Sequence, residues 1–233
     1  MREIDRIAVE ETGPGLLQMM EHAGLELARA ALAMLGERWR DARVVVLAGN
    51  GGNGGGGLCA ARLLASRGVE VLAVTIARPS TANGAVGAQL RMLHEAPAHV
   101  IAWSDAFDIA EADLVIDAVV GYGLREAPRG PVMALIRAAQ AASAPVLSLD
   151  LPSGVDADSG ETPGFAVQAT RTLTLALPKP GLRREQAGDL WLADLGIPPG
   201  VFARAGVAFD SRFGPHFGPA TQIRLRYPGE GGG

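Results

Sequence analysis

The sequence predicts an α/β protein in which helices cover both faces of a mostly parallel sheet. From residue 43 onward, short runs rich in β-branched residues alternate with stretches of helical periodicity. The first run, residues 44–47, is apolar without a break, which is typical of a strand buried on both faces. The chain has 233 residues, 48% of them hydrophobic, which is enough for a self-sufficient core.

The individual elements follow from the spacing of the apolar residues. Residues 3–35 have helical spacing with a break at residues 12–15, which predicts two helices joined by a turn. A strand at residues 44–47, a helix ending at Ser66 and a strand at residues 69–76 then form a βαβ unit. The further predicted strands are residues 99–103, 114–118, 145–149, 170–176 and 190–193, and the further predicted helices are residues 84–93 and 131–142.

Charge and cysteine content narrow the classes of partner. The 21 basic and 25 acidic residues give a net charge of −4 without a basic stripe, so neither nucleic acid nor an anionic membrane surface is an expected partner. No apolar run reaches the roughly 18 residues that a membrane span needs. The single cysteine, Cys59, excludes an intrachain disulfide and suits the reducing cytoplasm, where we expect the protein to work. A small-molecule partner is favoured.

A glycine-rich segment follows the first predicted strand. Of the 31 glycines in the chain, seven lie in residues 49–57. At the carboxyl end of a parallel strand and before a helix, such a loop can direct backbone N–H groups at a phosphate. Gly49, Gly51 and Gly54 match G-x-G-x-x-G, but a segment this rich in glycine matches many glycine motifs, and a flexible turn without a ligand is the alternative interpretation.

Two classes of nucleotide enzyme fit this segment poorly. A dinucleotide-dependent dehydrogenase places an acid at the end of the second strand, whereas this strand ends in Ile76, Ala77 and Arg78. A P-loop requires Lys and Ser or Thr at the start of the helix, whereas Leu58 and Cys59 follow Gly57 here. Phosphoryl transfer by a P-loop is therefore excluded, and the dehydrogenase hypothesis is weakened.

Two further predicted strands end in carboxylates. Asp117 precedes the glycine-containing residues 121–125, and Asp150 precedes residues 152–154. Both strand ends are expected at the same edge of the sheet as the glycine-rich segment, where a desolvated acid can hold a proton or a cation. Caps of local turns are the alternative role for these acids. Together Asn53, Asp117 and Ser153 would offer an amide, a carboxylate and a hydroxyl oxygen, a set that suits a hard cation rather than zinc.

In their order and spacing, several segments of the chain resemble the NAD(P)H-hydrate epimerase family. The resemblance covers residues 2–199 and implies a Rossmann-like three-layer α/β/α sandwich as the domain of residues 1–199. Residues 200–233 are then a C-terminal extension, expected to be partly irregular, with residues 229–233 frayed. The segments that carry the resemblance are residues 15–24, 117–124, 150–160, 177–181, 188–190 and 194–198.

The resemblance implies an isomerase that interconverts the R and S forms of NADHX and NADPHX in nicotinamide nucleotide repair. It implies a bound potassium ion, whose ligands match Asn53, Asp117 and Ser153, and a homodimer. The residues after Pro199 are too few for a second domain, so a separate NAD(P)H-hydrate dehydratase is the expected functional partner. Asp150 is the expected general acid and base. The positions that match substrate contacts are Gly52, Asn53, Gly54, Gly55, Gly56, Gly121, Tyr122, Gly123, Leu124, Arg125, Glu126, Ala127 and Asp150.

The glycine-rich segment departs from the family pattern at two positions. Where the family reads G-N-N-G-G-D-G, this chain has Gly52 in place of the first Asn and Gly56 in place of the Asp. Two side-chain contacts are therefore absent. A protein that kept the fold as a non-catalytic nucleotide-binding or scaffold protein is the alternative to an active epimerase, and an unrelated Rossmann-like enzyme is a third hypothesis.

Overall fold

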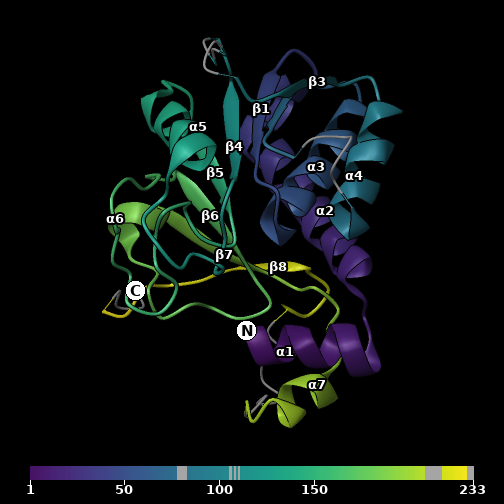
Figure 1. Cartoon of the computed structure of the whole chain (residues 1–233), viewed down its shortest axis with the longest axis vertical. Helices are drawn as coiled ribbons and strands as arrows, with labels where there is room; N and C mark the ends of the chain where they lie inside the picture. Colours follow the sequence, from purple (N-terminus) through teal and green to yellow (C-terminus); the bar gives the residue numbers. More distant parts are fainter. Residues whose placement is uncertain (78–82, 105–106, 108, 110, 208–216, 230–233) are drawn as a thin grey trace.

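The computed structural model describes residues 1–77, 83–104, 107, 109, 111–207 and 217–229. Its centre is one eight-stranded sheet in the order β3-β2-β1-β4-β5-β6-β7-β8, with all pairs parallel except β7 and β8 (Figure 1). This arrangement confirms the predicted α/β class. The strands are β1 (Arg43–Ala48), β2 (Glu70–Thr75), β3 (His99–Ala102), β4 (Leu114–Ala118), β5 (Val146–Leu149), β6 (Arg171–Leu175), β7 (Asp189–Ala193) and β8 (Gln222–Arg224).

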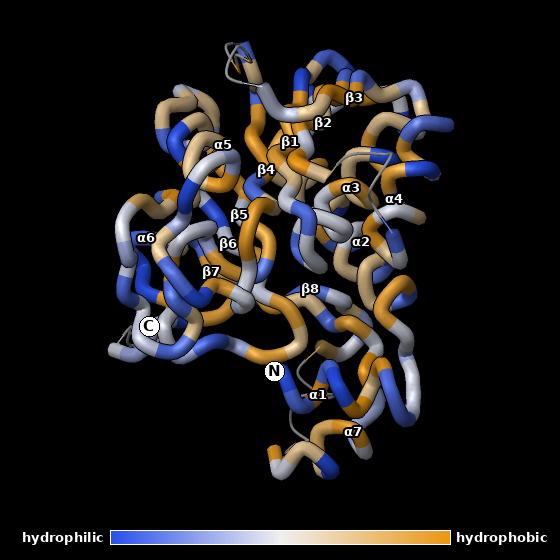
Figure 2. The backbone as a smooth tube through the Cα atoms, viewed as in Figure 1, coloured by the Kyte–Doolittle hydropathy of each residue, from blue (hydrophilic) through white to orange (hydrophobic). Residues whose placement is uncertain are grey.

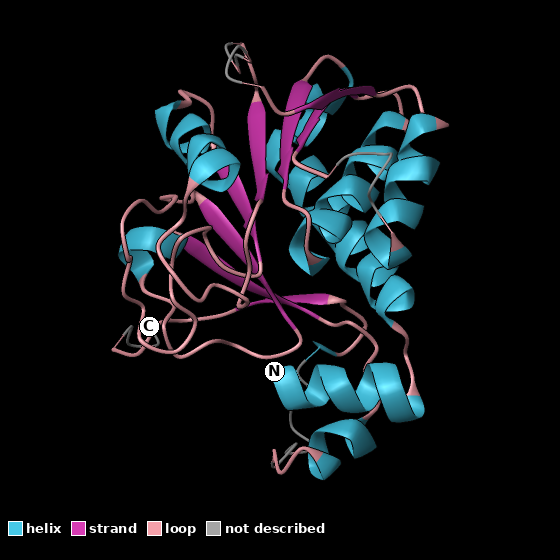
Figure 3. Ribbon diagram, viewed as in Figure 1, coloured by secondary structure: helices cyan, strands magenta, loops and turns pink. Residues whose placement is uncertain are grey.

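Helices cover both faces of the sheet and make it the middle of three layers (Figure 3). In Figure 1, α2, α3 and α4 lie on one side of the strands and α5 lies on the other. The helices are α1 (Arg2–Ile7), α2 (Leu16–Leu35), α3 (Gly52–Ala65), α4 (Gly84–His94), α5 (Gly130–Ala141), α6 (Arg184–Ala187) and α7 (Pro199–Arg204), with a π-helical turn at Ala8–Thr12 and a 3-10 turn at Gly36–Arg40.

Alternate residues of the same strand face the two different hydrophobic layers. On β1, Val44 and Val46 join the cluster that contains α2, α3 and α4, whereas Val45 and Leu47 join the cluster that contains α5. All four are fully buried, which explains why the sequence of β1 is apolar throughout. The hydropathy colouring shows the same pattern, with mainly apolar strands inside and polar residues at the outer turns of the helices (Figure 2).

The direction in which the chain builds the sheet reverses between β1 and β4. The chain runs from β1 outward through β2 to β3 and then returns to add β4 on the other side of β1. The connections after β1 and β4 therefore diverge, which leaves room for a ligand at the carboxyl ends of these strands. The glycine-rich segment and the residues after Asp117 lie at this point.

Close approach between backbone segments explains why several of residues 49–57 are glycine. A Cβ on Gly54 would lie 1.9 Å from the carbonyl oxygen of Gly49, and one on Gly57 would lie 2.5 Å from the Cβ of Ala118. The sequence analysis predicted a loop through Gly57, but α3 already begins at Gly52. Packing against the sheet outweighs the low helix propensity of glycine, because only glycine lets the first turns of α3 approach so closely.

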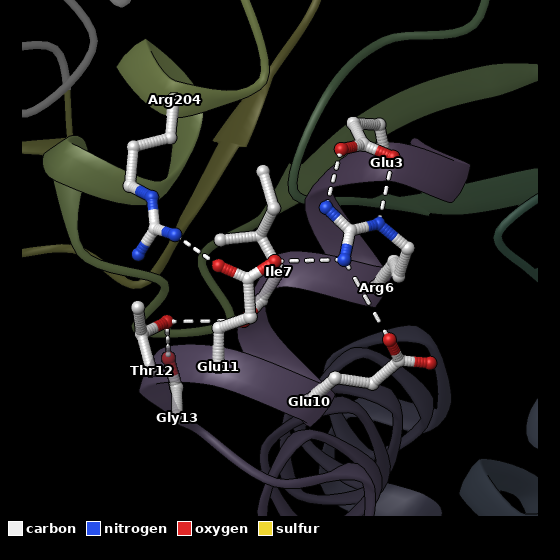
Figure 4. A network of polar contacts seen from close by, with 8 residues as sticks. All are labelled: Glu3, Arg6, Ile7, Glu10, Glu11, Thr12, Gly13 and Arg204. Carbon is white, nitrogen blue, oxygen red and sulfur yellow. Dashed lines mark hydrogen bonds and ion pairs between the residues drawn. The ribbon is translucent and has the colours of Figure 1, made fainter.

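The N-terminal helix packs against the segment that follows β7. Helices α1 and α7 lie side by side (Figure 1), and their apolar residues share one buried cluster with Leu195 and Ile197. Figure 4 shows the polar contacts beside this cluster: Arg6 binds Glu3 and Glu11, and Glu11 also binds Arg204.

The C-terminal extension contributes a strand to the same sheet, although no strand was predicted there. Strand β8 pairs with β7, and the Gln222 side chain donates to the backbone oxygen and the carboxylate of Glu26 on α2, both at 2.8 Å. Most of the predicted frayed end, residues 230–233, lies outside the described residues. Among the described residues, no helix combines the length and the apolar character that crossing a membrane requires.

A pair of alanine substitutions tests the close approach at α3. We expect Gly54→Ala to lower the free energy of unfolding by about 3 kcal/mol, since the added methyl group meets rigid backbone at Gly49. Gly52→Ala is the matched control: nothing lies within 4 Å of its added Cβ, and its stability should stay within about 0.5 kcal/mol of the unchanged protein. Urea unfolding measures both. Equal midpoints for the two variants would contradict the packing explanation.

Candidate functional site

The candidate site lies where the carboxyl ends of β1, β4, β5 and β6 meet. Asn53, in the first turn of α3, and Asp150, directly after β5, both face Gly121 in the segment after β4. A side-chain carbon added to Gly121 would lie 3.0 Å from Oδ2 of Asp150 and 3.2 Å from Oδ1 of Asn53. A side chain at position 121 would therefore crowd both the carboxylate and the amide.

The amide of Asn53 is incompletely satisfied. Its Nδ2 is buried and has no hydrogen-bond partner among the described residues. A buried N–H group without a partner is costly, so its presence at this edge of the sheet indicates a position for a ligand or an ordered water molecule. The Nδ2 group is therefore a donor available at this edge of the sheet.

Asp117, on β4, is fully buried and held by neutral donors. Oδ2 accepts hydrogen bonds from the Ser148 hydroxyl and the Ser153 N–H, both at 2.8 Å. Oδ1 accepts from the Ser153 hydroxyl at 2.5 Å and from the Val119 N–H at 3.3 Å. Burial raises the pKa of the Asp117 carboxyl above its usual range, and these hydrogen bonds oppose that rise.

The surroundings of Asp117 fit a hard monovalent cation. Ser153 Oγ lies 3.1 Å from the carbonyl oxygen of Val120, so carboxylate, hydroxyl and carbonyl oxygens come together without a basic side chain among the four donors to Asp117. A cation there would compensate a buried negative charge. In the part of the chain that the structure describes, no group of three or more His, Cys, Asp or Glu side chains is placed to hold a metal ion.

Asp150 has an unusual backbone conformation and two unequal oxygens. Its φ is +70°, in the left-handed region, which Asp adopts more readily than most non-glycine residues. Oδ1 accepts from the Lys179 ammonium group and from the Leu175 N–H at 3.3 Å. Oδ2 accepts from the Tyr122 N–H at 3.3 Å and is the oxygen that faces Gly121. Oδ2 is therefore the oxygen available to a ligand.

Lys179 is a site residue that the sequence analysis did not single out. It follows β6, is buried, and forms an ion pair with Asp150. The 21 basic residues of the chain are 20 arginines and this one lysine, a signal that was present in the sequence. Its segment, residues 177–181, entered the sequence analysis as part of the family resemblance, without a role for the lysine.

A second pair, Asp5 and Tyr122, joins α1 to the site. The Tyr122 hydroxyl donates to the carboxylate of Asp5. Burial raises the pKa of both groups, and the charges of Asp150 and Lys179 act on Asp5. Asp5 could not be predicted as a site residue, because nothing in the helical spacing of α1 shows that its polar face meets a loop more than a hundred residues away.

The predicted substrate contacts do not all reach this open edge. Gly52 is exposed with open space around it, and the segment of residues 121–127 is largely exposed. Gly55 and Gly56 are buried, and a Cβ on either would meet Met20 at 2.6 Å or Leu149 at 2.8 Å. The structure thus brings Asn53, Gly121 and Asp150 together but turns positions 55 and 56 toward the core.

The reversal of strand order, the glycine-rich turn and the polar strand ends define a Rossmann-like α/β protein with its site at the switch point of the sheet. The family described as YjeF-related protein N-terminus matches residues 16–181. The chain belongs to this family, as its resemblance to the NAD(P)H-hydrate epimerases predicted.

Two relatives and one solved structure indicate the breadth of the similarity. An NAD(P)H-hydrate epimerase of Dehalogenimonas lykanthroporepellens is 52% identical over 207 residues, 89% of this chain and 84% of that protein. A bifunctional NAD(P)H-hydrate repair enzyme of Hyperthermus butylicus is 44% identical, but this chain covers only 36% of its length. The crystal structure of the yeast protein ynu0 has 23% identity and a TM-score of 0.79 over 96% of both chains, which supports the fold.

Gly52 and Gly56 stand where the family pattern has Asn and Asp, and restoring those residues should affect stability unequally. Gly56→Asp would place a carboxyl group between Ala23 and Leu149, so we expect the free energy of unfolding to fall by about 1–3 kcal/mol. Gly52→Asn enters open space and should change stability by less than about 0.5 kcal/mol. Guanidinium unfolding followed by circular dichroism gives both values. If Gly56→Asp were as stable as Gly52→Asn, position 56 would not face the core as described.

Proposed function

We propose that this protein is an NAD(P)H-hydrate epimerase, an isomerase that interconverts the R and S forms of NADHX and NADPHX. The observation that carries the proposal is the carboxylate of Asp150, whose Oδ2 faces Gly121 opposite Asn53. The epimerase of Dehalogenimonas lykanthroporepellens, which aligns with most of this chain, supports the same activity.

The reaction requires a group that moves a proton. Epimerisation at a ring carbon that bears a hydroxyl group and is bonded to the ring nitrogen needs the C–O or the C–N bond to break and re-form on the other face. If the C–N bond opens, Oδ2 of Asp150 takes the hydroxyl proton as the carbonyl group forms and delivers it to the departing nitrogen, and both transfers reverse when the ring closes on the other face. If the C–O bond breaks, Asp150 donates the proton to the departing hydroxyl and recovers it from the water that adds. Either route uses one carboxyl group as both acid and base.

Binding of the diphosphate is assigned to the beginning of α3. The N–H groups of the first helical turn, at Gly52, Asn53 and Gly54, have no partner inside the helix, and the helix dipole favours an anion there. The exposed segment of residues 121–127 flanks the same edge and supplies the remaining contacts.

Asn53, Asp117 and Ser153 are assigned to a potassium ion. A bound cation would supply a fixed positive charge that orients oxygen atoms of the substrate. The buried carboxylate of Asp117 with its neutral donors supports this assignment.

The second candidate function is a non-catalytic nucleotide-binding or scaffold protein of the same fold. Gly52 favours it, because the open space there leaves a ligand without the amide contact that the family pattern provides. Loss of one such hydrogen bond costs about 0.5–1.5 kcal/mol of binding, which weakens a site without removing the proton-transfer group. For this reason we rank the epimerase first.

Three further expectations accompany the proposed function. The exposed apolar side chains of Val9, Leu16 and Leu17 support a homodimer formed through the α1–α2 junction. A separate NAD(P)H-hydrate dehydratase would consume the product, as the bifunctional relatives suggest. Cys59 is buried and is a free cysteine rather than part of a disulfide, which suits a reducing compartment, the cytoplasm.

Replacing the proposed acid and base tests the function directly. We expect Asp150→Asn to lower the rate of R/S interconversion by about 10²–10⁴-fold, because the amide neither accepts nor returns the proton. Chromatographic separation of the two epimers follows the reaction. Asp41→Asn, at the opposite edge of the sheet, is the control and should keep the full rate. A wild-type protein that binds NADHX but does not interconvert its epimers would favour the binding-protein alternative.

Thermal unfolding tests the potassium assignment without an activity assay. At ten times its dissociation constant, a bound ion adds about 1.4 kcal/mol of stability, or about 3–5 °C in Tm for a chain of this size. We expect this rise in KCl relative to tetramethylammonium chloride at equal concentration, and its loss in Asn53→Ala. Equal Tm values in the two salts would refute a potassium site.

A further inference from the structure

The single lysine of the chain is held with all of its donors occupied. The ammonium group of Lys179 donates to Oδ1 of Asp150, to the Thr174 hydroxyl at 3.2 Å and to the carbonyl oxygen of Leu175 at 2.7 Å. An ammonium group has three N–H donors and no acceptor, so these three contacts use it completely. Lys179 therefore has no donor left for a substrate, although it lies beside the proposed acid and base.

Its effect falls on one oxygen of Asp150. Lys179 and the Leu175 N–H both bind Oδ1, whereas Oδ2 accepts only from the Tyr122 N–H, at 3.3 Å. The lysine side chain is 4% exposed, as is that of Asp150, so solvent screens the pair weakly. Two donors from β6 and the segment after it thus fix the plane of the carboxylate and leave Oδ2 directed at Gly121.

We propose that Lys179 is a positioning residue of the epimerase: by holding Oδ1 of Asp150, it makes Oδ2 the oxygen that exchanges a proton with the substrate. This inference rests on the proposed function, since it assigns Lys179 a role through Asp150. An ammonium group suits three acceptors in a buried space, whereas the planar five-donor guanidinium of arginine does not match them. This difference explains why position 179 has lysine, although every other basic residue of the chain is arginine.

The charges around the pair set the expected pH behaviour. The charges of Asp150, Lys179 and the amino terminus act on Asp5 of α1, and the charges of Asp150, Asp5 and Arg2 act on the Tyr122 hydroxyl. Without the ammonium group, the carboxylate of Asp150 would be buried near a second acid, Asp5, and its protonated form would be favoured. The acid side of the rate profile would then move to higher pH.

The test compares kcat, KM and their pH dependence in wild type, Lys179→Met and Lys179→Arg. Lys179→Met should lower kcat by about 100-fold with little change in KM, because the carboxylate is misplaced while substrate binding is kept. Its acid limb should move to higher pH. Lys179→Arg keeps a positive charge, so its acid limb should stay near that of wild type although kcat falls. Arg183→Met, which removes an exposed cation from the same segment, should leave kcat and the pH profile unchanged.

Circular dichroism tests whether each variant is folded. If Lys179→Met does not fold, Thr174→Val carries the test: it removes one acceptor of the ammonium group and should lower kcat by about threefold to tenfold at constant KM. An Lys179→Met enzyme with wild-type kcat overturns the positioning role and leaves the proposed function intact. A fall in kcat with an unmoved acid limb in Lys179→Met also overturns it. A wild-type protein without epimerase activity overturns both.

Discussion

The site depends on a close backbone approach that only glycine permits. A Cβ on Gly49 would lie 2.0 Å from the carbonyl oxygen of Val119, and one on Gly54 would lie 1.9 Å from the carbonyl oxygen of Gly49. Because these positions lack side chains, the turn after β1 lies directly against the end of β4 and α3 begins at the edge of the sheet. Asn53 thereby reaches the same space as Asp150, which the chain adds nearly a hundred residues later.

Two acids of the same type, both buried at strand ends, are given different roles by their neighbours. Asp117 is surrounded by hydroxyl and backbone donors, and burial raises the pKa of its carboxyl. Asp150 has a buried ammonium group as its partner and a second oxygen that faces Gly121. The first environment suits a residue committed to a cation, and the second suits a residue that exchanges protons.

The two ends of the chain contribute to the region around the site. Helix α1 supplies Asp5, which binds Tyr122 after β4, and α1 is held in turn by α7 through a shared apolar cluster and the Glu11–Arg204 pair. The extension beyond residue 199 is therefore part of the packing that positions α1. The polar contact of Gln222 with Glu26 ties its last strand to α2 in the same way.

The local sequence was enough for the α/β class and for most of the order of the elements, because apolar periodicity is a local signal, and glycine or acid at strand ends predicted a site at one edge of the sheet. It predicted Asn53, Asp117, Ser153 and Asp150 as neighbours for the same reason: parallel strands end at one edge. Tertiary structure alone decided that α3 begins at Gly52, that positions 55 and 56 face the core, and that β8 completes the sheet. It also decided that Lys179 binds one oxygen of Asp150 and that Asp5 meets Tyr122. These features arise from packing and hydrogen bonds between residues far apart in the chain, which no local pattern encodes.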